Sequence, residues 1–347
     1  IVDEEQENAY KQTSSFPKYH AKEVALMRGK ISKATVILSS ATPSIESYFN
    51  YKSDKFKYLE LPKRFGNAKL PEVHLVNMID ENKATENYDT IFSQLLLDKI
   101  EDRIKKNEQV ILLHNRRGFA PILRCDDCGE ISKCPHCQLS LTFHKTDNVL
   151  KCHFCNFTKP PAGKCANCSS FNGRLSGTGT QKIEDELAKL FPDAVIDRLD
   201  LDAAPTAQKI FHALNKFSKN EIHILVGTQM IAKGLDFPNA TLVGIINADT
   251  GLFLPDFRSG EKVFQLIYQA AGRAGRGSVP GEVVVQTYNS DNEIINDAVN
   301  FDMVGYYEKC LAERSDLNYP PFSWLVKLEI RGKNKRHVSH AIETLNN

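Results

Sequence analysis

Long apolar runs are missing from this sequence. No window comes near the roughly 18 uninterrupted apolar residues of a membrane-spanning helix and no signal-peptide pattern is present, so we expect a soluble protein without a membrane partner. An excess of charge is also missing, because 44 Lys and Arg residues stand against 43 Asp and Glu residues, for a net charge of +1 at pH 7. This balance excludes a broadly basic surface, so contact with nucleic acid would have to come from local patches.

Fixed-period repeats and low-complexity tracts are absent too, which argues against a repeat architecture. The 347 residues suffice for two domains with buried cores. The chain opens at Ile1 inside a strand-like run and ends at Asn347 inside a helical pattern. We therefore expect it to be a piece of a longer protein.

Nine cysteines are present, and eight of them form four Cys-x-x-Cys pairs within one short segment. The pairs are Cys125/Cys128, Cys134/Cys137, Cys152/Cys155 and Cys165/Cys168. This spacing is typical of metal sites rather than disulfides, and it favours a reducing, cytoplasmic compartment. The ninth cysteine, Cys310, lies in a helical stretch and is interpreted as an inert core thiol.

Each Cys-x-x-Cys turn directs both sulfurs at one point, so four pairs predict two structural Zn²⁺ ions in closed four-thiolate sites. The metals replace a core that so short a segment cannot form. Sequential, interleaved and nested groupings of the pairs are all possible. We favour the nested one, because the gap from Cys137 to Cys152 can form a hairpin. His136, His144 and His153 are then bystanders.

Two acidic residues and a threonine follow strand-like runs near the start of the chain. Asp3 and Glu4 come after Ile1–Val2, and Thr42 comes after the run 34–38. In open α/β sheets, ligands bind beyond the carboxyl ends of the strands. In phosphoryl transfer, one acid at such a place holds Mg²⁺ and a neighbouring carboxylate polarises the attacking water. We assign Asp3 to the metal and Glu4 to the base, with plain surface charge as the alternative.

Glycine stands beside fixed positive charge in two stretches, 226–238 and 269–276, each of which follows an apolar run. Glycine lets the backbone approach an anion, backbone N–H groups donate to it, and Arg adds bidentate charge. Arg273 and Arg276 are three residues apart, so both can reach one terminal phosphate from the same face of a turn. We interpret them as arginine fingers. A solvated glycine-rich turn is the alternative.

Aromatic and cationic residues alternate between the acids and the next helix. They are Tyr10, Lys11, Phe16, Lys18 and Tyr19. Such a loop suits stacking on unpaired bases and contact with backbone phosphate. Ordinary packing is the alternative for this loop taken alone.

The rest of the pattern predicts a mostly parallel α/β sheet. In the first unit we expect a helix over 20–29 and a strand over 34–38. In the second unit we expect, in order, a helix over 88–105, a strand over 110–114, helices over 183–190 and 208–217, and strands at 195–199, 222, 242 and 283. The run 177–180 opens a helix and is a further candidate phosphate contact. Beyond 291 we expect a helix with Tyr306 and a strand over 324–330.

In this order, the stretches at Asp3, Ser40, Val226 and Gln269 match motifs II, III, V and VI of the superfamily 2 nucleic-acid helicases. Within that superfamily the chain resembles the primosomal protein N′ (PriA) family of replication-restart DNA helicases. The matching stretches are DEE at Asp3, YKQ at Tyr10, FPKYHAKEVA at Phe16, SATPSIE at Ser40, NRRGFAP at Asn115, GTGTQKIEDEL at Gly177, VGTQMIAKG at Val226, PDFRSGE at Pro255, QAAGRAGR at Gln269 and the eight-cysteine insertion.

The resemblance implies two RecA-like helicase lobes, the first one partial, with a two-zinc Cys-rich insertion in the second lobe and the start of a C-terminal α+β domain. The expected domains are the back half of lobe 1 (1–62), a linker and the start of lobe 2 (63–123), the zinc-binding insertion (124–173), the remainder of lobe 2 (174–290) and the start of the C-terminal domain (291–347).

The resemblance also implies an ATP-dependent motor that moves 3′ to 5′ on DNA, recognises forks, and works with primosome proteins and single-strand DNA-binding protein in bacterial cytoplasm. Asp3 and Glu4 would act on Mg²⁺ and water. The residues that would act on nucleotide phosphates are Gln269, Arg273 and Arg276, with Gly234, Asp236 and Gly272 near the cofactor. The residues expected to contact DNA are those of the aromatic loop together with Thr228 and Lys233.

Three departures from the family pattern limit this expectation. Gln6 stands where His is usual after DEE; Gln can still donate and accept a hydrogen bond, whereas Leu235, where His is also usual, cannot. The sequence contains no G-x-x-x-x-G-K-[ST] loop, so the chain has only part of the residues that bind the phosphates of ATP. We therefore expect ATP hydrolysis by the intact protein and none by this chain alone.

Two other functions stay open. The chain can be a zinc-stabilised module that binds DNA or a primosome partner without motor activity. It can also be an RNA helicase with a zinc insertion, which the aromatic loop and the cysteine segment disfavour.

Overall fold

The structure is a computed structural model, and it describes residues 1–12, 16–62, 70–114, 122–136, 139–153, 155–161, 163–176, 179–199, 206–228, 237–254, 256–275, 280–326, 330 and 332–346. Its contacts divide the chain into two units. Unit 1 holds Ile1–Pro43 and Tyr58–Tyr306, and unit 2 holds Ser44–Lys57 and Tyr307–Asn347. Each unit is described by itself below.

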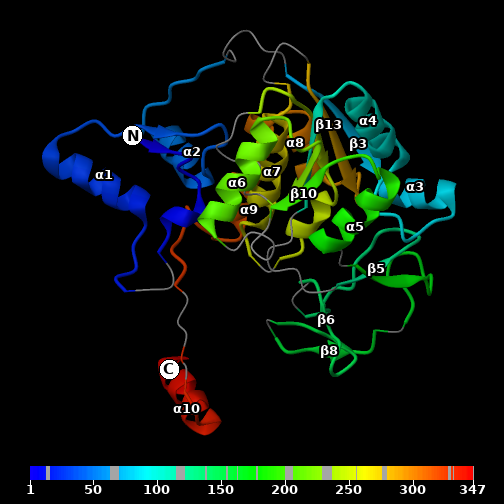
Figure 1. Cartoon of the computed structure of the whole chain (residues 1–347). Coiled ribbons are helices and arrows are strands. Elements are labelled where there is room, and N and C mark those ends of the chain that lie inside the picture. The colour runs from blue at the N-terminus through cyan, green and yellow to red at the C-terminus, as the bar shows by residue number, and fades with distance from the viewer. Residues whose placement is uncertain are drawn as a thin grey trace. The chain divides into compact units, whose positions relative to one another are not determined.

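A six-stranded sheet forms the centre of unit 1, with the strand order β10-β11-β4-β12-β13-β3 (Figure 1). Every neighbouring pair in this sheet is parallel. Its strands are β3 (Glu72–Asn77), β4 (Gln109–Leu113), β10 (Ile196–Leu199), β11 (Ile224–Gly227), β12 (Ala240–Ile245) and β13 (Glu282–Thr287). Parallel strands need crossover connections, which the helices between them supply.

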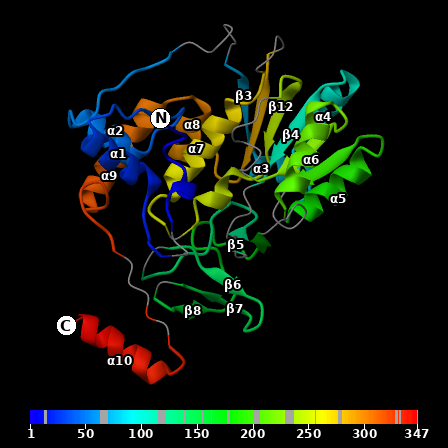
Figure 2. The ribbon, with the colours of Figure 1, turned by 60° about the vertical axis from the view of Figure 1, so that its left-hand side comes forward.

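Helices cover both faces of this sheet. Figure 2 shows α4 and α5 on one face and α7 and α8 on the other. The helices of this layer are α3 (Met78–Thr85), α4 (Gln94–Lys105), α5 (Thr180–Leu190), α6 (Ala207–Ser218), α7 (Ser259–Ala271) and α8 (Glu293–Val299). Because helices cover both faces, all five residues of β4 are buried. Strands buried in this way have mostly continuous apolar sequences.

Helix α4 illustrates how the sequence sets an element and its packing. The Ser93 hydroxyl caps its start by accepting a hydrogen bond from the Leu96 N–H at 3.3 Å, and Leu96 and Ile100, one turn apart, are fully buried. Gly244 on β12 lets this helix approach, because a Cβ there would lie 2.6 Å from Leu112 Cδ2 and 3.0 Å from Leu96 Cδ1.

The start of unit 1 is a smaller piece. The strands β1 (Val2–Asp3) and β2 (Leu38–Ser39) form a parallel pair. The short 3-10 helix η1 (Asn8–Tyr10) and the helix α1 (Ala21–Ser32) lie between them in sequence. The predicted site residues lie at or after the ends of these strands: Asp3 and Glu4 at the end of β1, and Thr42 shortly after β2.

A second sheet interrupts the parallel one between β4 and β10. It is antiparallel, with the strand order β8-β7-β6-β5-β9, and its strands come from the cysteine-rich segment (green, Figure 1). Its strands are β5 (Ile122–Cys125), β6 (Thr142–His144), β7 (Val149–Lys151), β8 (Thr158–Lys159) and β9 (Gly173–Ser176). The cysteine segment is therefore inserted into the larger α/β layer.

Unit 2 joins α2 (Ile45–Lys52) to the part of α9 (Met303–Asp316) that begins at Tyr307, and it includes α10 (Lys335–Asn346). Tyr48 packs edge-on against Tyr307, with ring centroids 4.9 Å apart. The Tyr48 hydroxyl donates to Glu308 Oε1 at 2.8 Å, and Lys52 pairs with the same oxygen at 2.8 Å. An aromatic contact and a shared carboxylate thus link segments that are distant in sequence.

The α/β class with a cysteine-rich insertion is confirmed, and several element boundaries are wrong. The helix expected over 88–105 begins at Gln94, because Ser93 caps it. The strand expected over 34–38 is reduced to Leu38–Ser39, and β3 and α3 were not anticipated. In the expected strand 324–330, the described residues 324–326 have no regular structure. Among the described helices, none combines the length and the apolar character needed to cross a bilayer.

The buried Gln286 supplies a test of this fold. Its Oε1 accepts from the Ser93 N–H at 2.8 Å, and its Nε2 donates to the carbonyl oxygens of Ile91 at 2.8 Å and Ile246 at 3.0 Å. Gln286→Leu keeps the side-chain size and leaves these buried backbone groups without the amide, so we expect a loss of roughly 2–4 kcal/mol in the free energy of unfolding.

Urea denaturation measures this loss. Gln208→Ala, on the exposed face of α6, is the matched control and should leave the midpoint unchanged. An unchanged midpoint in the Gln286→Leu variant would contradict the role assigned to this amide.

Candidate functional site

The structure brings together residues from three of the separated stretches. The Gln269 amide, near the end of α7, donates to Thr42 Oγ1 at 3.0 Å and to Glu4 Oε2 at 3.4 Å. Thr42 is fully buried and Gln269 is 7% exposed, so these contacts are shielded from water. One side chain of the large α/β layer therefore contacts the residues that follow β1 and β2, at the carboxyl end of this parallel pair.

Glu4 is held in an unusual backbone conformation. Its φ of 48° lies in the left-handed region, which non-glycine residues rarely occupy and which is common at functional sites. The Gln6 amide donates to Glu4 Oε2 at 2.7 Å. Two amide donors, one nearby in sequence (Gln6) and one distant (Gln269), thus fix the orientation of the Glu4 carboxylate. Gln6 therefore uses the donor capacity of its amide, as expected from its side chain.

Asp3 lies at the carboxyl end of β1. The Ser39 hydroxyl donates to Asp3 Oδ1 at 2.6 Å, and the Tyr10 hydroxyl donates to the Asp3 carbonyl oxygen at 2.7 Å. The residue is exposed, so its carboxylate is accessible to a hydrated cation. Ser39 was not predicted as a partner, although its place at the end of the neighbouring strand β2 was a signal.

A buried ion pair fixes the third acid of the DEE run. Lys22 Nζ lies 2.9 Å from Glu5 Oε2, and the two side chains are 9% and 1% exposed. Lys22 lies in the first turn of α1, so the pair ties the start of this helix to the strand end that carries Asp3 and Glu4. Sequence reasoning missed Lys22, because nothing in its local pattern separates it from a solvated lysine.

A backbone hydrogen bond joins the two ends of the aromatic loop, and its residues Phe16 and Tyr19 are exposed. The Gln12 N–H donates to the Tyr19 carbonyl oxygen at 2.8 Å, while the Phe16 side chain is 95% exposed and that of Tyr19 is 50% exposed. Lys11 and Lys18 are exposed as well. Exposed rings between cations are what stacking on unpaired bases requires.

The remaining predicted residues are placed as follows. Thr228 is buried directly after β11, Gly272 ends α7 and Arg273 follows it, half-buried. Lys233, Gly234, Asp236 and Arg276 lie outside the described residues. The role of Arg273 as an arginine finger stays a prediction.

Packing explains why one position of the Gly-Arg stretch (269–276) is a glycine. Gly275 has a φ of 65°, and a Cβ there would lie 2.0 Å from the backbone nitrogen of Gly281. The turn after α7 must pass directly against the segment that leads into β13. Glycine at this position lets the two backbone segments lie in direct contact.

The cysteines form two clusters. The sulfurs of Cys125, Cys128, Cys165 and Cys168 lie within 4.8 Å of one another, as do those of Cys134, Cys152 and Cys155. Cys137 lies outside the described residues. Within the described residues this agrees with the nested grouping, because the two outer pairs share one cluster and Cys134 shares the other with Cys152 and Cys155.

The donor set fits Zn²⁺. The sulfurs of Cys125 and Cys168 are 3.5 Å apart, and those of Cys128 and Cys165 are 3.6 Å apart. Sulfurs at the corners of a tetrahedron around Zn²⁺ lie about 3.8 Å apart, given a Zn–S distance of about 2.3 Å. Close packing of four thiols around one point is therefore already present in the outer cluster.

The pKa shifts of the cysteines in the outer cluster also favour a bound cation. Burial raises the pKa of the Cys125 thiol to about 12. Burial acts in the same direction on Cys165, but the backbone N–H groups of Cys168 and Asn167 outweigh it and lower that pKa to about 7. Four thiolates can share this space only when a divalent charge offsets their own.

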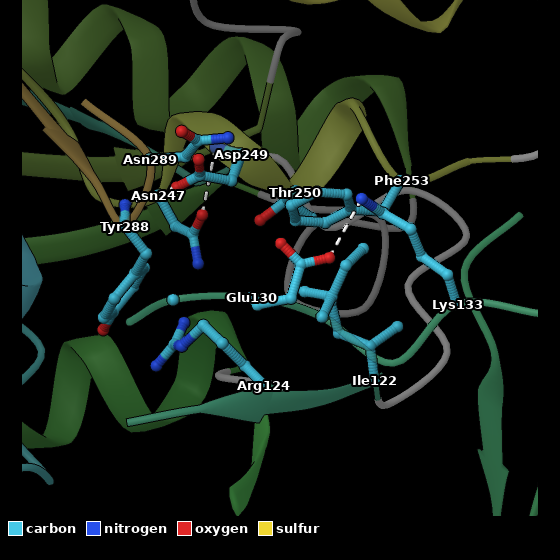
Figure 3. Close-up of a pocket in the computed structure, with 12 residues that line it drawn as sticks. Ile122, Arg124, Glu130, Lys133, Asn247, Asp249, Thr250, Phe253, Tyr288 and Asn289 are labelled. Carbon is cyan, nitrogen blue, oxygen red and sulfur yellow. Dashed lines mark hydrogen bonds and ion pairs between the residues drawn. The ribbon is translucent and has the colours of Figure 1, made fainter. Parts of the chain in front are cut away.

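A small cavity of about 50 Å³ lies where the cysteine-rich sheet contacts the large α/β layer (Figure 3). The Arg124 guanidinium on β5 lies 3.2 Å from the centroid of the Tyr288 ring, just past β13. The buried Asp249 accepts from the Tyr288 N–H at 2.7 Å and from the Thr287 hydroxyl at 2.8 Å, and burial raises its pKa. A Cβ on Gly129 would lie 2.4 Å from the Tyr288 carbonyl oxygen.

This attachment was not anticipated from the sequence. Its residues come from the insertion and from the ends of β12 and β13, and no motif joins them. The contacts fix the insertion to the carboxyl edge of the parallel sheet, which is the edge where such sheets bind ligands.

Comparison with known proteins identifies two regions. Residues 134–160 match the PriA DNA helicase Cys-rich region (CRR) domain, and residues 178–278 match the helicase conserved C-terminal domain. The replication restart protein PriA of Bacillus subtilis (strain 168) is 43% identical over 332 residues, which is 95% of this chain and 41% of that protein. Its Chlamydia pneumoniae counterpart is 43% identical over 335 residues, 96% of this chain and 45% of that protein. The chain thus spans less than half the length of these two relatives.

Metal analysis tests the cysteine clusters. We expect two Zn²⁺ per chain, one for each cluster. Cys128→Ser and Cys155→Ser should each lose about one equivalent, because one thiolate is removed from one closed site. Elemental analysis by mass spectrometry gives the count.

Cys310→Ser is the control for this measurement, since Cys310 lies in α9 outside both clusters, and it should keep both ions. Anomalous scattering at the zinc edge that locates one metal or none in the wild-type protein would contradict the assignment.

Proposed function

We propose, because this chain belongs to the PriA family of replication restart proteins, that it is part of an ATP-dependent DNA helicase that moves 3′ to 5′ and acts in replication restart. The observation that carries the proposal is the Gln269 amide, which contacts Thr42 and Glu4. A motor of this kind needs groups on two lobes to respond to one nucleotide. Gln269 supplies that link within the described residues.

Each residue then has a role in ATP hydrolysis by the intact protein. Asp3, whose carboxylate is oriented by the Ser39 hydroxyl, would hold Mg²⁺. Glu4 orients and polarises the attacking water, and two amide donors hold its carboxylate in place. Arg273 and Arg276 stabilise the charge that develops on the transferred phosphoryl group.

The aromatic loop connects DNA to this chemistry. Bases stack on Phe16 and Tyr19, and the loop is joined to the acids by the bond from the Tyr10 hydroxyl to the Asp3 carbonyl oxygen. The Glu5–Lys22 pair makes a second connection, through the start of α1. Movement of the loop on DNA binding is therefore transmitted to the strand end that carries Asp3 and Glu4.

We propose further that this chain alone does not hydrolyse ATP. The sequence has no G-x-x-x-x-G-K-[ST] loop, so it lacks the lysine and the backbone amides that hold the β- and γ-phosphates. The partners of the intact protein are forked and single-stranded DNA, primosome proteins and single-strand DNA-binding protein. A zinc-stabilised module that binds DNA or a partner without motor activity is the second candidate, supported by the two cysteine clusters.

DNA-stimulated ATP hydrolysis by the intact protein separates the two candidates. We expect Arg273→Ala to reduce the turnover number by about 10³-fold or more, because a positioned arginine supplies that much in related phosphoryl transfers. Zinc content should be unchanged. Arg336→Ala, at an exposed position of α10, is the matched control.

A wild-type intact protein that binds DNA without DNA-stimulated turnover would favour the module and overturn the motor. Robust turnover by the 347-residue chain, abolished by Glu4→Gln, would contradict the claim that this stretch is inactive alone.

A further inference from the structure

We propose that His144 and His153 form an open binding site for a divalent transition-metal ion such as Ni²⁺, separate from the two cysteine clusters. The two Nε2 atoms lie 3.3 Å apart, although the residues are nine positions apart in the chain. Two imidazole nitrogens at about 2.0–2.1 Å from one metal lie about 2.9 Å apart at the right angle of a square or octahedral shell and about 3.3 Å apart at the tetrahedral angle. The observed separation lies within this range.

The orientation of the rings agrees with this function. The ring centroids are 5.0 Å apart, the two Nε2 atoms only 3.3 Å, and the ring planes are tilted by 49°, so the Nε2 edges of the two rings approach each other and the rings do not stack. Neither nitrogen belongs to the inner sulfur cluster, whose described members are Cys134, Cys152 and Cys155. The histidines therefore make a second point of convergence in the same small sheet.

The surrounding backbone fixes the positions from which both rings project. His144 is the last residue of β6 and is in register with Val149 on β7. His153 lies inside the turn between Cys152 and Cys155, where the Cys152 N–H donates to the Phe157 carbonyl oxygen at 2.8 Å and the Asn156 N–H donates to the Cys152 carbonyl oxygen at 3.0 Å. A pair fixed in advance by backbone bonds loses little freedom when it binds an ion.

The ligand class follows from the donors. Imidazole nitrogen suits Ni²⁺, Cu²⁺ and Zn²⁺, whereas Mg²⁺ and Ca²⁺ prefer oxygen. His153 is exposed and His144 is half-buried, so water completes the coordination shell and the ion exchanges with solvent. In the metal-free pair one Nε2–H donates to the other Nε2. On binding, that proton moves to Nδ1 of its own ring, both Nε2 lone pairs face the metal, and no net proton is released.

The test uses the 347-residue chain loaded with Zn²⁺ and freed of excess metal, to which Ni²⁺ is added in a calorimeter. We expect a saturable Ni²⁺ equivalent in the wild type, while elemental analysis shows that the zinc count does not fall. His144→Ala and His153→Ala should each abolish that equivalent, because a single imidazole does not chelate.

His136→Ala is the matched control. His136 lies between the cysteines of another Cys-x-x-Cys turn, and its ring packs 5.3 Å from that of Phe157. This variant should bind Ni²⁺ like the wild type. Equal loss in all three variants, or no saturable binding in the wild type, would overturn the proposal.

A measurement on unmutated protein covers the case in which a variant does not fold. Diethylpyrocarbonate acylates accessible imidazole nitrogens, and mass spectrometry locates the products. We expect Ni²⁺ to protect His144 and His153 while exposed His212 stays reactive. Unchanged acylation of the pair in the presence of Ni²⁺ would count against the site.

Discussion

The hydrogen bonds of the Gln269 amide are the constraint on which the candidate site depends. They connect residues that are 227 and 265 positions apart in sequence, and they do so where water has little access. A buried amide must satisfy its donors, so loss of either acceptor carries a desolvation cost. The geometry therefore favours an arrangement in which the acids of the β1–β2 piece stay next to the end of α7, where the Gly-Arg stretch begins.

The cysteine-rich sheet obeys a different constraint. Its buried core is small, since the cluster there contains only Cys134, Leu141, Leu150 and Cys152, so apolar burial alone cannot hold it. We propose that Zn²⁺ in the two cysteine clusters supplies the missing stabilisation. The Arg124–Tyr288 contact fixes the sheet to the parallel layer, and β5 carries both Arg124 and the cluster residue Cys125.

The sequence predicted the strands that are buried on both faces and the edge strand β10, and it missed the other edge strand, β3. β4, β11, β12 and β13 are continuous apolar runs, whereas β3 mixes Glu72, His74 and Asn77 with apolar residues because one of its sides faces solvent. The nested cysteine grouping followed from the length of the inner gap. The partners Lys22, Ser39 and Tyr288 could not be found, because their roles arise from proximity in space and not from any spacing along the chain.

A double-mutant cycle on the intact protein tests the central claim most directly. Gln269→Ala, Thr42→Ser with its hydroxyl retained, Thr42→Val and the Gln269→Ala/Thr42→Val pair are compared by the turnover number of DNA-stimulated ATP hydrolysis. If one bond joins the two pieces, the pair loses about as much as either Gln269→Ala or Thr42→Val alone, and Thr42→Ser is close to wild type. Losses that simply add, or a Thr42→Val variant with normal turnover, would contradict the account.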